Sequence, residues 1–567
     1  MKLYNLIYSL TLLLLVETSA SQQQQQQSLQ VAFQKQSVVI EKPAIVNYRL
    51  HGRFLHITDI HLDKHYLEGA TIKSDCHRAP HKHKKKKKRQ GKLAGYWGAP
   101  GTDCDSPRRL VHHAIDTIAR DWKDKIDFIL WTGDNARHDG DVKLTRTKKE
   151  ILGYNKKVTQ LIQKAFTLDN NRTLPIVPCI GNNDVHPHNQ LRGMKNNPQL
   201  LEYSQLWSDF IPQDQQKHFR KGGYFASDVV PGAIRVLSLN SLYFFGSNDI
   251  VSTCSDPTSP GYQHVQWMKK QLKKARQENM KVLIIGHVPP TVKTFKDSCL
   301  DDYIKLSTKY ADLIIGHMYG HSNMDHFQII SRKYSDVARL SKEEDDDDDN
   351  DDGEEEGSTV EWIQKDADRF ISTLHKQYRK LQKIRDREDL VVIHVAPPML
   401  PLFYPTFRIN EYNADMTSSH FGDWLRYTQW YSNLTYWNEQ VDNQKQQQLL
   451  TQASNKEPWH TKPEFEIEYS TDETYNMTDL TSSSWFEFAE RISSKEGHDL
   501  WKVYLSNMFV QSNNDWYGQS LPEDDHDDQD DDQNNENERM PFILPLPAMA
   551  WFDWLKQKAF LFAEMLL

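Results

Sequence analysis

The chain has 567 residues and a formal net charge of −9, and this length can bury a large core in one catalytic domain with appendages. The average charge hides two acidic runs, 343–356 and 523–538, which hold 12 and 10 acidic residues; outside them Lys and Arg outnumber Asp and Glu. A basic body suits a polyanionic partner, and because no base-stacking module is apparent, nucleic acid is not expected.

The N-terminal residues 1–20 contain one apolar stretch, 3–16, directly after Lys2. A stretch of this length is short for a membrane span and typical of the apolar region of a signal peptide. We therefore expect a signal peptide or a signal anchor, and no second spanning segment follows. Residues 21–48, which begin with a run of glutamines at 22–27, are expected to form a low-complexity linker.

Five polar motifs follow short apolar runs between residues 50 and 330. Runs of about four apolar residues bounded by Gly or Pro are typical of buried strands. We expect such strands at 54–57, 128–131, 176–180, 282–285 and 313–315. The side chains that follow them are hard or borderline metal ligands. In chain order these are Asp59 and His61, Asp134, Asn182 to Asp184, His287, and His321 with Asn323.

Helical patterns lie between the expected strands. Ser106 and Pro107 are a typical N-cap and first-turn pair, and the apolar residues from Leu110 to Trp122 share one helical face. Residues 265–275 repeat this pattern, with lysines on the opposite face. Alternating strands and helices predict an α/β sheet, whose sites form outside the carboxyl ends of the strands. All five motifs are therefore expected on one rim.

In this order the motifs resemble the calcineurin-like metallophosphoesterases, in the branch that includes acid sphingomyelinase. Longer stretches look like the fungal vacuolar endopolyphosphatases, over roughly residues 50–412 and weakly again around 465–492. The resemblance implies an α/β fold, a metallophosphoesterase-type sandwich of two mixed β-sheets flanked by helices. These stretches are 103–107, 133–139, 223–225, 261–263, 286–290, 320–327 and 408–412.

Carried over motif by motif, the resemblance implies two divalent metal ions that share one carboxylate. Such a pair clamps the attacking and leaving oxygens of an in-line displacement. Asp134 is the implied bridging residue. One ligand set is Asp59, His61, Asp134 and Asn323; the other is Asp134, Asn182, His287 and His321.

Two details of these sets depend on the histidines and amides near residue 320. His317 is an alternative to His321, but the residues after His321 match the family, so we assign His321 to the metal and His317 to a strand end. Asn323 stands where most of the superfamily has His. Because an amide oxygen is a harder ligand than imidazole, we expect tolerance toward Mg, Mn or Co rather than Zn alone.

Asn183 stands where the family usually has a histidine that is taken to protonate the leaving group. An amide cannot supply that proton, and an alkoxide, with a pKa near that of water at about 15.7, needs it. A phosphate leaving group, with its higher pKa near about 6, can depart as an anion. The residue therefore favours a phosphoanhydride substrate. His138 is expected to contact phosphate as a cation, the alternative being a solvated loop histidine, so the predicted catalytic residues are Asp134, His138 and Asn183.

Because the N-terminal segment predicts passage through the secretory pathway, where disulfides form, we expect the cysteines to pair. Cys76 and Cys104 flank a basic insert, and Cys254 and Cys299 flank a predicted helix and strand. From this local spacing we choose these two pairs. Cys179 is then expected to be a buried free thiol.

The remaining segments divide the chain around one catalytic domain. The basic run 81–89 either holds polyanion or is a solvated loop, and the apolar tail is expected to dock as a helix rather than to span a membrane. Sequons begin at Asn171, Asn433 and Asn476. The predicted segments are a catalytic domain at 49–412 with a disordered insert at 341–358, a C-terminal extension at 413–515, an acidic disordered segment at 516–540 and the tail at 541–567.

The leading interpretation is an endopolyphosphatase that cuts internal bonds of inorganic polyphosphate with a metal-activated water. The resemblance implies a vacuolar location, in the membrane or the lumen, reached through the secretory pathway, with membrane contact if the N-terminal segment is retained. One alternative is a sphingomyelinase-like phosphodiesterase, which would need an acid at Asn183 and a saposin-type module. The other is a catalytically inactive, polyanion-binding membrane protein, and the retained ligand residues argue against it.

Overall fold

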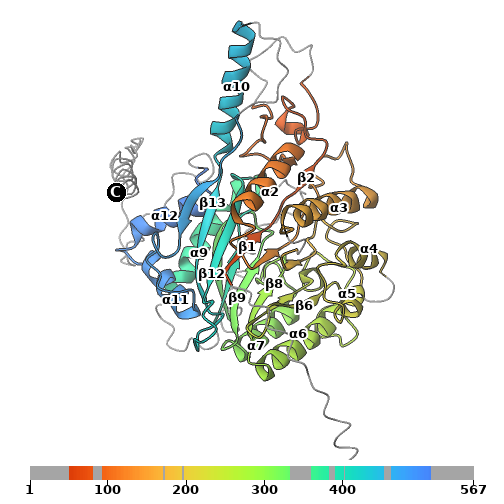
Figure 1. Ribbon diagram of the computed structural model, residues 1–567, viewed down its shortest axis with the longest axis vertical. Helices are drawn as coiled ribbons and strands as arrows, with labels where there is room; N and C mark the ends of the chain where they lie inside the picture. Colours follow the sequence, from red (N-terminus) through yellow and green to blue (C-terminus); the bar gives the residue numbers. More distant parts are fainter. Residues whose placement is uncertain are drawn as a thin grey trace, which may run out of the picture. The chain divides into compact units, whose positions relative to one another are not determined.

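The computed structural model describes residues 50–80, 92–169, 173–193, 197–331, 359–381, 390–400, 402–451 and 461–512 (Figure 1). The predictions for the signal segment, the linker, the basic run, both acidic runs, Asn171 and the apolar tail lie outside these residues. In the described part of the chain, no helix is both long and apolar enough to cross a membrane.

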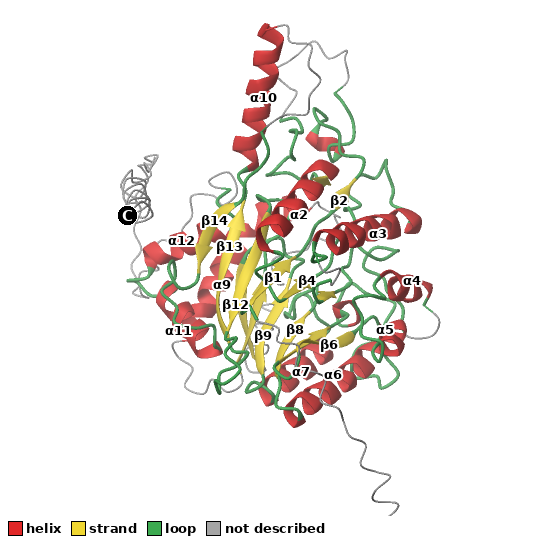
Figure 2. Cartoon of the chain, in the orientation of Figure 1, coloured by secondary structure: helices red, strands yellow, loops and turns green. Residues whose placement is uncertain are grey.

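The first sheet has six strands in the order β14-β13-β12-β1-β4-β5 (Figure 2). The strands β1, β4 and β5 are parallel, whereas β12, β13 and β14 each run antiparallel to their neighbours. Their bounds are β1 (Arg53–Ile57), β4 (Phe128–Trp131), β5 (Ile176–Pro178), β12 (Thr406–Tyr412), β13 (Trp424–Tyr431) and β14 (Glu466–Ser470).

The second sheet has the order β10-β11-β9-β8-β7-β6, with parallel central strands and an antiparallel strand at each edge. A short parallel pair, β2 (Leu62–Asp63) and β3 (Ser106–Pro107), lies outside both sheets. The prediction of two mixed sheets flanked by helices is confirmed. The bounds in the second sheet are β6 (Phe225–Val230), β7 (Ile234–Ser238), β8 (Lys281–Ile285), β9 (Ile314–Tyr319), β10 (His326–Ser331) and β11 (Leu390–Val395).

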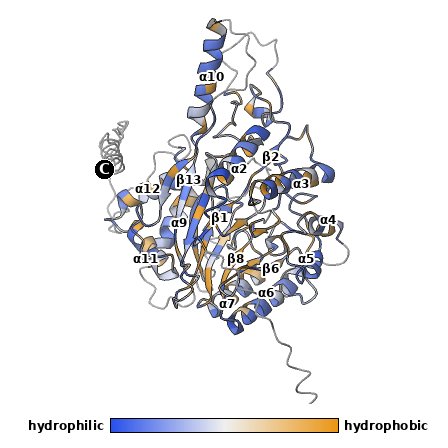
Figure 3. Cartoon of the chain, viewed as in Figure 1, coloured by the Kyte–Doolittle hydropathy of each residue, from blue (hydrophilic) through white to orange (hydrophobic). Residues whose placement is uncertain are grey.

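Most of the helices bury an apolar face and turn polar residues outward, whereas α10 projects away from the sheets (Figure 1). Strands of the second sheet are largely orange in Figure 3, whereas the outer faces of α6 and α7 are blue. The predicted face of α2 from Leu110 to Ala119 is buried, as are the predicted apolar positions of α6. The helices are α2 (Arg108–Trp122), α3 (Lys148–Ala165), α4 (Pro198–Leu206), α5 (Gln216–Gly222), α6 (Pro260–Gln277), α7 (Asp297–Lys309), α9 (Thr359–Leu381), α10 (Leu434–Thr451), α11 (Ser482–Ile492) and α12 (His498–Met508).

The predicted N-cap at Ser106 is wrong. Ser106 belongs to β3, and its backbone N–H donates to the His61 carbonyl at 3.0 Å, so the residue is held in an extended pair before the helix begins. Pro107 occupies the cap position and makes no side-chain cap hydrogen bond. The same residue pair does cap α6, where the Ser259 side chain accepts from the Tyr262 N–H.

Both predicted disulfides are present. Cys76 pairs with Cys104 and Cys254 pairs with Cys299, while Cys179 is a buried free thiol. Two disulfides are typical of proteins that pass through the secretory pathway.

The residues after 412 contribute to the first sheet. Strands β13 and β14 extend it beyond β12, and α11 packs against α9. The described residues all belong to one unit, 1–518. The division of the chain at residue 412 stays a prediction.

Candidate metal centre

Five of the seven predicted ligand residues share an unusual backbone conformation, a positive φ. Residues other than glycine rarely adopt positive φ, and such strain persists only where the surrounding structure over-determines it. The close approach of the loops contributes here, because a Cβ on Gly181 would lie 2.0 Å from Asp134 Oδ1 and one on Gly320 would lie 2.3 Å from Asp59 Oδ2. Five predicted site residues have φ between 41° and 72°: Asp59, His61, Asp134, His321 and Asn323.

The first half of the centre is built around His61. Its Nδ1 donates to the Ala136 carbonyl at 3.0 Å, which fixes the tautomer and leaves Nε2 as the free ring nitrogen. That Nε2 lies 3.5 Å from Asp59 Oδ1 and 3.7 Å from Asp134 Oδ2. In the described part of the chain neither His61 Nε2 nor Asn323 Oδ1 has a hydrogen-bond partner, although both atoms are buried. These are the properties of metal-binding atoms.

The second half converges on the side-chain oxygen of Asn182. Asn182 Oδ1 lies 2.7 Å from His287 Nε2 and 2.9 Å from His321 Nδ1. His287 Nδ1 donates to a backbone carbonyl, that of Thr132, so its Nε2 also faces the cluster. The Asn182 amide nitrogen donates to the side chains of Asn189 and His188, which turns the oxygen toward the histidines.

Asp134 belongs to both halves. Its Oδ2 lies 3.1 Å from His287 Nε2 as well as facing His61. Among the described residues, three groups of side chains place potential ligand atoms within 4.8 Å of one another. Two of them contain Asp134: Asp59 with His61 and Asp134, and Asp134 with His287 and His321. The third is His61 with Asp105 and His138. This donor set of carboxylate, imidazole and amide oxygens fits two divalent cations that share one carboxylate.

The electrostatics of the centre reflect this crowding of carboxylates and imidazoles. Burial lowers the pKa of His61, but the nearby Asp59 and Asp134 outweigh it and raise the pKa to about 9. His287 behaves in the same way beside Asp134. Burial, together with the charge of His287, lowers the pKa of His321 to about 3. The cluster therefore attracts positive charge at its centre.

Asn183 is turned toward Asp134. Its Nδ2 donates to Asp134 Oδ2 and its backbone N–H to Asp134 Oδ1, both at 2.8 Å. Its Oδ1 accepts from Arg146 Nη1 at 3.1 Å. Both ends of the amide are thus engaged, and the side chain orients Asp134. The leaving-group position that the family comparison implied for residue 183 stays a prediction.

His138 forms a pair with Asp105 that sequence reasoning missed. His138 Nδ1 lies 2.8 Å from Asp105 Oδ1, and its backbone N–H donates to Asp105 Oδ2 at 2.6 Å. The ring stacks on that of His61 with 4.0 Å between centroids, and the side chain is 23 % exposed. His138 therefore borders the first half of the centre. The only signal for Asp105 was its position inside the stretch 103–107.

Asp184 is a second missed residue. Its buried carboxylate accepts the backbone N–H groups of Asp134, Asn135, Ala136 and Gly181 at 2.8–3.1 Å. It thereby fixes the loop that carries Asp134 after β4. Its place as the last residue of the Gly-Asn-Asn-Asp motif was the available signal.

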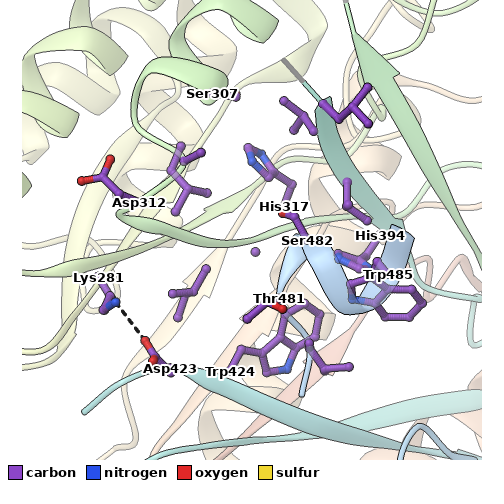
Figure 4. Close-up of a pocket in the computed structure, with 18 residues that line it drawn as sticks. Lys281, Ser307, Asp312, His317, His394, Asp423, Trp424, Thr481, Ser482 and Trp485 are labelled. Carbon is purple, nitrogen blue, oxygen red and sulfur yellow. Dashed lines mark ion pairs between the residues drawn. The ribbon is translucent and has the colours of Figure 1, made fainter. Parts of the chain in front are cut away.

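His317 lies away from these residues. It lines a pocket of about 200 Å³ together with His394, Trp424 and Trp485 (Figure 4), and its Nδ1 lies 2.6 Å from the Tyr303 hydroxyl. The Lys281–Asp423 ion pair lies at the same pocket. None of the residues of the metal cluster lines it. The pocket is therefore separate from the predicted ligand residues.

The chain is similar to known phosphoesterases in sequence. A family model described as calcineurin-like phosphoesterase matches residues 52–322. The chain is 36 % identical to an endopolyphosphatase of Cryptococcus neoformans over 404 residues, which cover 64 % of this chain and 58 % of that protein. It is 35 % identical to an endopolyphosphatase of Candida glabrata over 458 residues, which cover 71 % and 68 %. It is 41 % identical to an endopolyphosphatase of Saccharomyces cerevisiae over 284 residues, which cover 49 % of this chain and 41 % of that protein.

The matched region leaves part of these relatives uncovered. The chain spans less than two thirds of the length of most of the first curated relatives it matches. Among solved structures, a dimetal phosphatase from Danio rerio aligns with a TM-score of 0.31 and 10 % identity, covering 66 % of this chain and 94 % of that chain. A structure of PhoD aligns with a TM-score of 0.35 and 8 % identity, covering 79 % and 77 %.

Proposed function

Because the chain belongs to the endopolyphosphatase family of calcineurin-like phosphoesterases, we propose that it hydrolyses internal phosphoanhydride bonds of inorganic polyphosphate. The observation that carries the proposal is the position of Asp134 in two of the three groups of potential metal ligands among the described residues. The excess of Lys and Arg outside the acidic runs supports a polyanionic substrate.

In this proposal the two halves of the centre would hold two divalent ions, whose chemistry would be to activate water and polarise the phosphoryl oxygens. Asp134 would contribute to both sets of ligands, and Asn183 and Asp184 hold its side chain and its loop in position. Asp59, His61 and Asn323 complete the first set of ligands, and Asn182, His287 and His321 complete the second. The amide oxygens favour Mg, Mn or Co beside Zn.

His138 is proposed to hold a phosphate oxygen beside the first ion. Asp105 engages Nδ1, so Nε2 is the ring nitrogen that remains to face a substrate. The 23 % exposed side chain is accessible to such a substrate.

The preference for an anhydride follows from Asn183. With both ends of its amide engaged, this residue supplies no proton to a leaving group. A phosphate leaves as an anion, whereas an alkoxide does not. We therefore expect fast cleavage of polyphosphate and slow cleavage of alkyl phosphodiesters.

The test compares rate with leaving-group pKa at saturating metal for the wild type, Asn183→His and Asn183→Ala. Histidine should speed alkyl diester cleavage by about 10²–10⁴-fold, the usual effect of a positioned general acid, with little gain on polyphosphate. Asn183→Ala is the control, because it also loses the hydrogen bond to Asp134 but supplies no acid. A wild type that cleaves sphingomyelin-like diesters as fast as polyphosphate contradicts the proposal and favours the sphingomyelinase-like alternative.

A gel of long-chain polyphosphate digested with each of Mg, Mn, Co and Zn separates the remaining alternatives. Internal cleavage produces a ladder of intermediate lengths, whereas cleavage from the ends produces monophosphate and a slowly shortening band. Absence of cleavage with all four metals favours the inactive polyanion-binding protein. The vacuole, in its membrane or lumen, is the proposed location, in keeping with the two disulfides and with the family.

A further inference from the structure

A buried ion pair lies directly beside the loop that carries His321 and Asn323. Asp325 is 5 % exposed, and its Oδ2 accepts from Arg408 Nη2 at 2.7 Å. Arg408 belongs to β12 of the first sheet, whereas Asp325 lies between β9 and β10 of the second. The pair therefore ties the two sheets together next to the candidate metal centre.

The pair is enclosed by residues from the C-terminal part of the chain. Arg408 Nε donates to Gln429 Oε1 at 2.8 Å, and its guanidinium lies 3.9 Å from the centre of the Tyr427 ring. The Tyr469 hydroxyl donates to Asp325 Oδ2 at 2.5 Å. Burial lowers the pKa of Arg408, but Asp325 outweighs this effect and raises it above the ordinary value. Arg408 is therefore charged.

The backbone of Asp325 is also held from a distant segment. Its N–H donates to the Met508 carbonyl at the end of α12, at 3.0 Å. At the other end of the loop, the His321 N–H donates to Asp59 Oδ2 at 3.1 Å. Between these anchors Asn323 has φ of 54°, and its side-chain oxygen has no hydrogen-bond partner among the residues that the structure describes. Its position thus depends on the anchors and not on bonds of its own oxygen.

We infer that the Arg408–Asp325 pair, closed by Tyr469, positions Asn323 and His321 for metal binding. Residues after 400 are then required to position ligands of the candidate metal centre. This inference rests on the proposed function for the roles of His321 and Asn323 as ligands.

The test measures metal binding by the full chain after treatment with EDTA, with Co²⁺ as the probe and its visible absorption as the readout. Tyr469→Phe removes one hydroxyl that holds Asp325, and Co²⁺ affinity should fall by about 3–10-fold, the effect of one lost hydrogen bond. Tyr475→Phe is the matched control, because its buried hydroxyl bonds Asn507 and does not contact Asp325. Equal Co²⁺ affinity in the two variants overturns the inference.

A second variant separates positioning from stability. Asp325→Asn combined with Arg408→Met removes both charges, so neither is left buried alone. Its unfolding midpoint should stay near that of the wild type, while the affinity for one of two Co²⁺ ions falls by about 10–100-fold and the absorption spectrum changes. The single variant Arg408→Lys keeps the charge but not the planar fork that joins Gln429 and Asp325. Its Co²⁺ affinity should lie between those of the wild type and the double variant.

The outcomes distinguish the inference from the function it rests on. A wild type that binds fewer than two Co²⁺ ions contradicts the proposed two-metal centre itself. A wild type that binds two ions, with a folded double variant that binds both equally well, overturns only the positioning role. If the double variant does not fold, the comparison of Tyr469→Phe with Tyr475→Phe decides.

Discussion

Two buried groups of charged side chains include residues of the 320–325 loop, and they differ in hydrogen bonding. Around Arg408 and Asp325 the charges are paired at 2.5–2.8 Å. In the candidate metal centre, His61 Nε2 and Asn323 Oδ1 are buried with no hydrogen-bond partner among the described residues, and Asp59 faces the same imidazole as Asp134. An unpaired buried polar group costs about 1–3 kcal/mol. Removing one partner from the paired cluster should therefore destabilise the fold, whereas the unpaired atoms of the candidate centre remain available for binding.

The largest effect is expected on activity, at Asp134 in the candidate metal centre. Asp134→Asn should lower polyphosphate cleavage by about 10³-fold or more, because bound metal supplies several kcal/mol of charge stabilisation. The variant should remain folded, although it loses the charge that faces His61 and His287. Metal content, turnover and thermal unfolding check this. Near wild-type turnover with full metal content would rule out the bridging role.

The opposite result is expected at the paired cluster. Asp325→Asn should lower the free energy of unfolding by about 3–5 kcal/mol, because it leaves Arg408 as an unpaired buried cation. Denaturant unfolding without metal measures the loss. Adding Arg408→Met should restore most of it. A single variant as stable as the wild type would mean that the two clusters do not differ in the way described.

The disulfides provide a covalent reference for the size of these effects. Replacing both Cys254 and Cys299 with Ser opens a link with a sequence separation of 45, and the chain-entropy model predicts a loss of about 3–4 kcal/mol. The double substitution at Cys76 and Cys104, with a separation of 28, should cost slightly less. Cys179→Ser removes a thiol but no link, so it is the control. Losses no larger than in that control would contradict the expectation.

A smaller, pH-dependent effect is expected at His77, a paired charge that can titrate. Its ring nitrogens lie 2.8 Å from Asp63 Oδ2 and 2.8 Å from Asp141 Oδ2. Burial lowers the pKa of His77, but these carboxylates outweigh it and raise the pKa above the ordinary 6.5. The stabilisation is therefore complete below about pH 6.5 and is lost as pH rises through the folded pKa.

The unfolding midpoints of the wild type and of His77→Gln are measured between about pH 5.5 and 9, because histidine titrates in this range. The advantage of the wild type should shrink above about pH 6.5. Parallel curves would show that His77 carries no charge-dependent contribution.

The sequence predicted the ends of β1, β4 and β8 and both disulfides because these depend on local features. The predicted end of β9 was wrong, because the strand continues to Tyr319 and contains His317. Short apolar runs before Asp59, Asp134 and His287 indicated buried strands, and parallel strands bring such ends to one rim. Side-chain direction was not predictable in this way. The amide of Asn183 bonds a carboxylate 49 residues away, and Asp105 meets His138 across 33 residues. Ser106 fits a cap pattern, but pairing with a distant strand overrides it.

The anchoring of Asp325 has a consequence for biosynthesis. Tyr469, which donates to Asp325, follows it by 144 residues, and Met508 is more distant still. At about 5–20 residues per second, roughly 7–30 s pass on the ribosome between these two residues. During that interval the early strands can form, but the loop with His321 and Asn323 lacks its anchor. The candidate metal centre thus depends on segments that are synthesised well after its own predicted ligands.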